Sequence, residues 1–120
     1  MNPSPWEIWW AKVKFEDDPS MIKERPVLVI SVENASYISL KMTSSEPRPD
    51  FQGEYQVIEW KQAGLTKPTV IRSSKVLELF KRDFGTKIGN LPLQDILNVQ
   101  NILHELDTLH ELGILNEKKA

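Results

Sequence analysis

Two candidate phosphate-binding groups lie where expected strands begin and end. Arg25 separates a polar loop from the apolar run Pro26-Val27-Leu28-Val29-Ile30, and the pair Thr43-Ser44 ends the next expected strand. The planar guanidinium of arginine donates two parallel hydrogen bonds to an oxyanion, and a hydroxyl group donates one more. If folding brings the two strand ends together, these side chains suit the binding of a phosphate group.

Each of these groups also has an ordinary structural explanation. An acid such as Glu16 or Glu24 is near enough in sequence to pair with Arg25, an arrangement that contributes little at a surface. Threonine suits strands because its Cβ is branched, and both hydroxyls can cap a turn. The residue types alone therefore leave both explanations open.

Catalysis by paired histidines or by a metal ion finds little support. His104 and His110 lie on an expected helix, about 240° apart around it at 3.6 residues per turn, so they cannot meet at one phosphate within a subunit. The chain has no cysteine and no compact cluster of histidines with carboxylates. We expect neither a metal site nor a cofactor.

The first two expected strands carry the aromatic and apolar side chains of the N-terminal third. Residues 6–15 alternate in hydrophobicity, with one face formed by Trp9, Ala11, Val13 and Phe15. A polar loop runs to Glu24. Pro26 is expected to open the second strand, because proline has no N–H for an interior position of a sheet.

The third expected strand, residues 36–43, ends at the candidate hydroxyls. Its alternation places Ile38, Leu40 and Met42 inward and Ser39, Lys41 and Thr43 outward. Further strands are expected at residues 55–60, 69–74, 76–80 and 88–91, with a turn of helix at 61–64.

Residues 92–112 are expected to form one helix, because apolar side chains recur at three- and four-residue steps and Gly113 follows its end. The fold expected is mostly β with a C-terminal α-helix. We expect a single domain over residues 1–120, with a small SH3-like barrel over about 6–91. Whether the leucines of the helix only close the barrel or also extend a dimer interface is left open.

Composition and charge exclude several classes of protein. Of the 120 residues, 40% are hydrophobic and 27% are charged, which is typical of a soluble globular domain. No apolar run approaches the ~20 residues of a membrane span, and the N-terminus does not resemble a secretion signal. With no cysteine for disulfides, we expect a cytoplasmic protein with no membrane partner.

Basic side chains are concentrated in one segment. The formal net charge of −2 argues against a general nucleic-acid coat, yet residues 61–89 carry seven bases and two acids. The bases are Lys61, Lys67, Arg72, Lys75, Lys81, Arg82 and Lys87. Such a stretch is ordinarily solvated surface, and it becomes a phosphate track only if it folds beside Arg25.

The tryptophans near the N-terminus leave more than one role open. Trp9 is expected in the core. Trp6 and Trp10 suit the core, a dimer contact or a platform on which bases stack, with burial as the more ordinary outcome.

Taken in order, these motifs resemble the MazF/PemK family of toxin endoribonucleases from bacterial toxin–antitoxin modules. The resemblance runs from about Trp6 to Leu97, nearly the whole chain. Its motifs are the aromatic first strand, the RPVLVIS segment Arg25–Ser31, the strand end Met42-Thr43-Ser44, the segment Thr69–Arg72 and the segment Lys87–Leu91.

The resemblance implies a MazF/CcdB-like barrel, usually homodimeric, that cleaves single-stranded RNA such as mRNA without a metal. The ribose 2′-hydroxyl attacks the adjacent phosphate, leaving a 2′,3′-cyclic phosphate and a free 5′-hydroxyl. Arg25 matches the family's catalytic arginine, and Thr43 matches its phosphate-binding threonine. Further substrate contacts are expected from Ser44, Lys23, Lys41 and Arg72.

Because the nucleophile belongs to the RNA, the protein needs to align it and to stabilise the developing charge. Guanidinium stays protonated, so Arg25 suits charge stabilisation, with proton donation to the departing 5′-oxygen as a second role. Thr43 would hold a non-bridging oxygen. The group that removes the 2′ proton is left open among Glu16, Asp17, Asp18 and Glu24.

The chain departs from the family in the loop before the arginine, and we identify it as a divergent branch. Residues 17–24 are acidic where many members are glycine-rich and basic, and Glu24 replaces a common basic residue. The alternative is therefore a barrel of low or no catalytic activity that binds nucleic acid or protein as a regulatory module. The resemblance also implies a cognate antitoxin, whose disordered acidic segment would land on the basic residues of 61–89.

Overall fold

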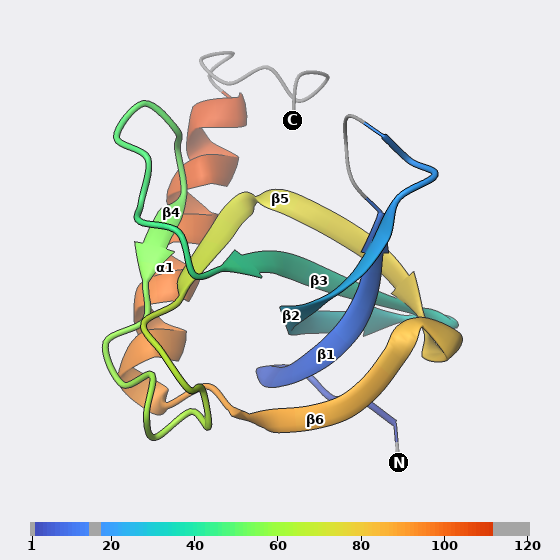
Figure 1. Ribbon diagram of the computed structural model, residues 1–120. Coiled ribbons are helices and arrows are strands. Elements are labelled where there is room, and N and C mark those ends of the chain that lie inside the picture. The colour runs from blue at the N-terminus through green and yellow to red at the C-terminus, as the bar shows by residue number, and fades with distance from the viewer. Residues whose placement is uncertain (1, 15–17, 112–120) are drawn as a thin grey trace.

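The computed structural model describes residues 2–14 and 18–111, with side chains described as far as Thr108. The strands are β1 (Glu7–Lys14), β2 (Ile22–Glu33), β3 (Ser36–Thr43), β4 (Glu54–Gln56), β5 (Val70–Phe80) and β6 (Phe84–Asn90). A 3-10 turn, η1 (Lys81–Asp83), joins β5 to β6, and the helix α1 (Leu93–Glu111) follows β6 (Figure 1). The expected class, mostly β with a C-terminal helix, is confirmed. No helix in this part of the chain is long and apolar enough to cross a membrane.

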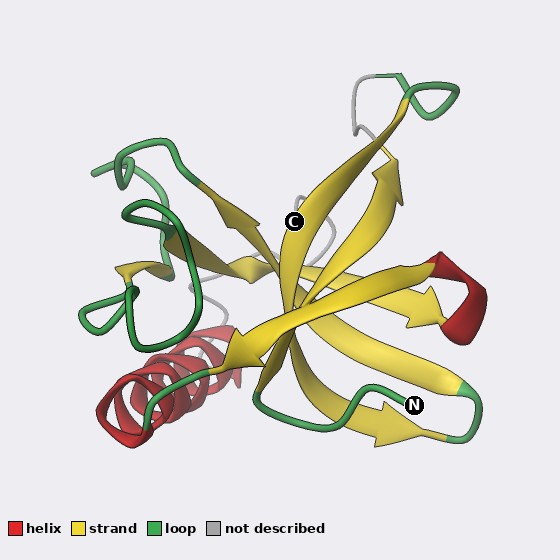
Figure 2. Ribbon diagram, turned by 60° about the horizontal axis from the view of Figure 1, so that its bottom comes forward, coloured by secondary structure: helices red, strands yellow, loops and turns green. Residues whose placement is uncertain are grey.

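The strands form one strongly bent antiparallel sheet. Their order is β4-β5-β3-β2-β1-β6, so β4 and β6 are its two end strands. The helix α1 lies at one side of the bent sheet, beside β4 and β5 (Figures 1 and 2).

Two glycines close the gap between the end strands. A Cβ atom on Gly64, in the turn after β4, would lie 2.5 Å from the carbonyl oxygen of Ile88 in β6. A Cβ atom on Gly89 would lie 2.0 Å from the carbonyl oxygen of Ala63. Gly64 also has a φ of +92°, which favours glycine. Backbone contact between this turn and β6 therefore completes the barrel.

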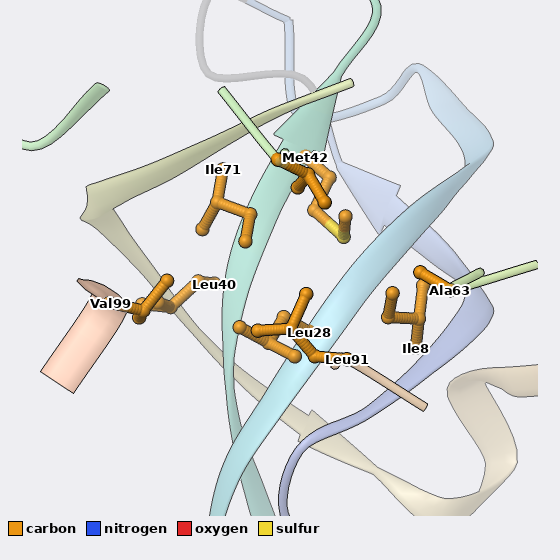
Figure 3. Close-up of a cluster of buried hydrophobic side chains, with 9 residues drawn as sticks. Ile8, Leu28, Leu40, Met42, Ala63, Ile71, Leu91 and Val99 are labelled. Carbon is orange, nitrogen blue, oxygen red and sulfur yellow. The ribbon is translucent and has the colours of Figure 1, made fainter. Parts of the chain in front are cut away.

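Two hydrophobic clusters fill the barrel. The main cluster is formed by Ile8, Leu28, Leu40, Met42, Val57, Ala63, Ile71, Leu91 and Val99, most of which are drawn converging in Figure 3. The second cluster is smaller and is formed by Ala11, Val13, Val27 and Leu79. Neighbouring residues of β2 join different clusters, Leu28 the first and Val27 the second. This explains why the apolar run of β2 does not alternate, as in strands buried on both faces.

The expected alternation of β1 and β3 is confirmed with one exception. Trp9, Ala11 and Val13 are buried on one face, and β3 spans residues 36–43 as expected; Phe15 lies outside the described residues. Ser39 was expected to point outward and is fully buried. It pairs with Val29 on one side and Leu77 on the other, and its hydroxyl donates to the Tyr37 carbonyl oxygen.

The expected start of β2 at Pro26 is wrong, because the strand begins at Ile22. Pro26 pairs with Trp10 of β1, whereas the ladder to β3 starts only at Val27. At Pro26 the strand therefore has one neighbour, as at a sheet edge, where a residue without an N–H is tolerated.

The expected strand at 55–60 is mostly a turn. Asp95, fully buried at the start of α1, accepts hydrogen bonds from the Ile58 and Glu59 amides at 2.8 and 3.1 Å, which draws the chain out of the sheet after Gln56. The strands expected at 69–74 and 76–80 are one strand, β5. A bulge interrupts its pairing, since Lys41 faces Arg72 while Leu40 faces Val76.

Candidate functional site

A pocket of about 260 Å³ lies where β2 and β3 approach the turn that closes the barrel. Arg25 and Glu24 of β2 line it together with Thr43 and Ser44 at the end of β3. The expectation that the guanidinium and the hydroxyls meet in one cavity is therefore confirmed by the geometry.

Strand register brings Arg25 and Thr43 together. The last pair of the β2–β3 ladder is Val27 with Lys41, and Arg25 and Thr43 come two residues further along their strands. Because side chains alternate along a strand, residues two apart share a face, and these two positions face each other across the strand ends. The pairing of β2 with β3 is thus what builds the pocket.

The polar groups in the pocket are available to a ligand. Among residues 2–14 and 18–108, no side chain forms a hydrogen bond or ion pair with the exposed Arg25. The hydroxyl of Thr43 accepts a hydrogen bond from the Ser45 amide and donates to the Ser45 hydroxyl at 3.3 Å. That long donated bond can be exchanged for a bond to a ligand oxygen.

The remaining wall of the pocket is largely apolar. Trp10, Pro26, Met42, Leu65 and Ile88 contribute to it. Trp10 is 40% exposed, which leaves its indole accessible for stacking with a base. By contrast, Trp9 is buried as expected, and Trp6 packs against the main cluster.

The basic segment 61–89 does not form a track beside Arg25. Lys67 is its one member that lines the pocket. Arg72 pairs with Glu54 at 3.4 Å, Lys87 pairs with Glu7 at 3.0 Å, and Arg82 lies 5.0 Å from the Phe80 ring centroid. The sequence alone did not single out Lys67, since its place depends on the closing turn.

Of the expected substrate contacts, only Ser44 lines the pocket. Lys41 and Arg72 face each other in the β3–β5 ladder, and Lys23 lies opposite Val13. Arg72 shares the buried carboxylate of Glu54 with Arg48, so it has a structural role in neutralising that charge.

A buried network holds the turn that carries Gly64 and Lys67. The Tyr55 hydroxyl donates to Asp95 at 2.5 Å, and the Asn98 amide donates to the Tyr55 hydroxyl at 2.9 Å. Burial, reinforced by the Asp95 carboxylate, raises the pKa of Tyr55 to about 12. The amides of residues 58 and 59 also donate to Asp95. The helix α1 therefore holds the turn that forms part of the pocket wall.

The possible metal ligands of the described residues lie apart from one another. No group of three or more histidines and acids there is placed to hold a metal ion. His104 is exposed on α1, and the side chain of His110 lies outside those described.

Comparison with solved structures shows several toxins of the same fold. The Mycobacterium tuberculosis toxin MazF-mt6 superposes with a TM-score of 0.59 and 22% identity, covering 82% of this chain and 89% of that one. An endoribonuclease in complex with its cognate antitoxin, from a mycobacterial species, gives a TM-score of 0.66 at 13% identity, covering 95% and 98%. The MazE–MazF structure (Form-II) from Deinococcus radiodurans gives 0.63 at 18% identity, covering 88% and 95%.

No curated protein sequence matches the chain significantly. The family model of the PemK-like, MazF-like toxins matches residues 4–106, which include every strand, the pocket and most of α1. The chain therefore belongs to the PemK-like, MazF-like toxins of type II toxin–antitoxin systems.

Proposed function

We propose that this protein is an endoribonuclease toxin that cleaves single-stranded RNA, such as mRNA, without a metal ion. The observation that carries the proposal is the shared pocket of Arg25 and Thr43, in which the guanidinium has no partner among the described side chains. Family membership supports it, as does the similarity in fold to a mycobacterial endoribonuclease.

The proposed reaction is attack of the ribose 2′-oxygen on the adjacent phosphorus, which forms the 2′-oxygen–phosphorus bond and breaks the bond to the 5′-oxygen. The 2′ proton passes to a carboxylate, and the departing 5′-oxygen takes a proton from Arg25 or from water. Arg25 stabilises the charge that grows on the phosphoryl oxygens, and Thr43 donates to a non-bridging oxygen. Lys67 adds a second positive charge to the pocket, and Ser44 adds a second hydroxyl. Trp10 offers a stacking face for a neighbouring base.

Glu24 is the proposed acceptor of the 2′ proton. It is the one carboxylate among the residues that line the pocket. Of the other acids considered, Asp18 accepts hydrogen bonds from Ser20 at the tip of the β1–β2 connection, and Glu16 and Asp17 lie outside the described residues. In-line displacement places the attacking and leaving oxygens on opposite sides of phosphorus, and in this proposal Glu24 acts on the 2′-oxygen while Arg25, which also lines the pocket, acts on the phosphoryl oxygens.

The proposal includes a cytoplasmic homodimer and a cognate antitoxin. Similar structures include an antitoxin complex from a mycobacterial species and a MazE–MazF assembly from Deinococcus radiodurans. Two leucines of α1, Leu93 and Leu97, are 71% and 46% exposed, and they give the dimer an apolar contact in this proposal.

The test is incubation of the purified protein with a mixed-sequence RNA in the presence of a chelator. Mass spectrometry of the fragments is expected to show 2′,3′-cyclic phosphate and 5′-hydroxyl ends. Arg25→Ala is expected to slow cleavage about 10²–10³-fold. Lys81→Ala removes an exposed cation outside the pocket and should cleave as the wild type does. Intact RNA, or equal cleavage by the Arg25→Ala variant, would refute the proposal.

A further inference from the structure

The loop between β3 and β4, residues 44–53, begins where β3 ends and folds back onto the sheet (Figure 1). We call it the β3–β4 loop. Its far end is fixed to β5, because the Ser73 amide donates to the Gly53 carbonyl oxygen at 2.9 Å. Among the side chains of residues 44–50, only that of Arg48 is partly buried. Arg48 is therefore the candidate anchor for the near half of the loop.

Three hydrogen bonds join Arg48 to Glu54, the first residue of β4. The Arg48 amide and Nε donate to one carboxylate oxygen at 3.2 and 3.3 Å, and Nη2 donates to the other at 3.3 Å. The Glu54 side chain is 2% exposed, so dissolved salt screens the pair little. The guanidinium carbon also lies 3.6 Å from the Phe51 ring centroid. Because a planar guanidinium fits a carboxylate in one orientation, this pair fixes Arg48 in direction as well as in distance.

Glu54 belongs to the same set of paired strands as Thr43. It faces Arg72 across the β4–β5 ladder, and its carboxylate lies 3.4 Å from the Arg72 Nε. Arg72 in turn faces Lys41 across the β5–β3 ladder. Lys41 precedes Thr43 by two residues on β3. The carboxylate that anchors the loop and the Thr43 hydroxyl are therefore held by one framework of strands.

Ser45 connects the β3–β4 loop to the Thr43 hydroxyl. Its amide donates to the Thr43 Oγ1 at 3.2 Å. Since the hydroxyl oxygen accepts this bond on one side, its own proton points elsewhere and can be given to a ligand in the pocket. Only two residues, Glu46 and Pro47, come between Ser45 and the anchoring arginine. Proline fixes its own φ and restricts the residue before it, so this short connection is stiff.

We propose that Arg48 is a positioning residue for the Thr43 hydroxyl. Its pair with Glu54 holds the Ser45 amide on the hydroxyl oxygen, which presents the hydroxyl proton to a phosphate oxygen. Arg48 does not line the Arg25 pocket, so it acts through Thr43 and not by contact with the RNA. The effect on cleavage rests on the proposed function, whereas the effect on the Ser45 amide does not.

The first measurement uses the protein without RNA. Arg48→Met keeps an apolar stem and removes the guanidinium donors, while Glu54 keeps Arg72 as a partner. The NMR order parameter of the Ser45 amide is expected to fall from about 0.85, typical of rigid backbone, to below about 0.6. Arg82→Met is the matched control, because Arg82 also lies beside an aromatic ring but sits on η1, away from the loop. It should leave the Ser45 order parameter unchanged.

The second measurement is a double-mutant cycle in single-turnover cleavage of an RNA oligonucleotide. Arg48→Met is expected to slow the rate at saturating protein about three- to tenfold, with little change in the protein concentration that gives half of that rate. In a Thr43→Val background the same substitution is expected to have almost no effect, because the hydroxyl that Arg48 positions is gone. Arg82→Met should cleave as its parent does in both backgrounds. Circular dichroism checks that each variant is folded.

An unchanged Ser45 order parameter in Arg48→Met would overturn the inference, whether or not the protein cleaves RNA. Equal slowing of cleavage in the wild-type and Thr43→Val backgrounds would also overturn it, since Arg48 would then contact the RNA or act on the whole fold. If the wild type leaves RNA intact, the nuclease proposal fails, and the order parameter still tests the link from Arg48 to Ser45.

Discussion

Gly89 of β6 lies so close to Ala63 that a Cβ atom on the glycine would fall 2.0 Å from the Ala63 carbonyl oxygen. This contact joins the turn after β4 to the far end strand, and Gly64 and Ile88 on either side of it line the Arg25 pocket. Barrel closure and pocket formation are therefore the same structural event.

We expect Gly89→Ala to destabilise the fold and to impair cleavage. The added methyl group would meet rigid backbone on the opposite segment, and overpacking of this kind costs about 1–3 kcal/mol or more. Urea denaturation measures the loss. Gly85→Ala is the control in the same strand, because its nearest neighbour would be the Glu24 side chain at 3.4 Å, an ordinary contact. Equal stability of the two variants would contradict the closure argument.

Thr43→Val is expected to reduce the cleavage rate about tenfold, because it removes one donated hydrogen bond while keeping the shape of the side chain. Thr43→Ser keeps the hydroxyl and should retain most of the activity. Single-turnover cleavage of an RNA oligonucleotide measures both. If valine and serine variants cleave equally fast, the hydroxyl does not hold the phosphate.

Glu24→Gln is expected to slow cleavage by about 10² or more, because glutamine keeps the size of the side chain but cannot accept the 2′ proton. Single-turnover cleavage of an RNA oligonucleotide measures the change. Asp18→Asn is the matched control, because Asp18 bonds to Ser20 and does not line the pocket. If the glutamine variant cleaves as fast as the wild type, another group accepts the 2′ proton.

The sequence was enough to predict the site residues whose positions depend on the pairing of neighbouring strands. Arg25, Thr43 and Ser44 meet because a short β2–β3 hairpin, turned at Asn34 with a φ of +57°, fixes their register. Lys67 could not be foreseen in the same way. Its place depends on the contact of the closing turn with β6, which joins segments distant in sequence.

The errors in the predicted strands have the same origin. Nothing in the alternation of residues 55–60 shows that Asp95 will take the Ile58 and Glu59 amides, because that carboxylate arrives from α1. Ser39 has the polarity of an outward residue, yet the second cluster covers its face. Tertiary contacts override the local pattern at both places.

Asp95→Ala is expected to destabilise the protein by ~2 kcal/mol or more, because it leaves two backbone donors and the Tyr55 hydroxyl without their acceptor. Urea denaturation measures the change, and activity should fall with it because the turn carrying Lys67 is released. Asp107→Ala, exposed on the same helix, is the control. Equal effects would mean that α1 is not what holds the turn.

Stability at high pH should depend on Tyr55. Burial and the neighbouring Asp95 carboxylate raise its pKa from 10.0 to about 12, so folding favours the protonated phenol. The contribution of Tyr55 to the free energy of unfolding is therefore complete below pH 10 and is lost as the pH rises through about 12.

Tyrosinate absorbance should show a component near pH 12 that disappears in Tyr55→Phe and moves to lower pH in Asp95→Asn. The chain has two tyrosines, so the absorbance curves of the wild type and Tyr55→Phe are compared per tyrosine. If these curves superimpose, Asp95 does not hold the Tyr55 phenol in its protonated form.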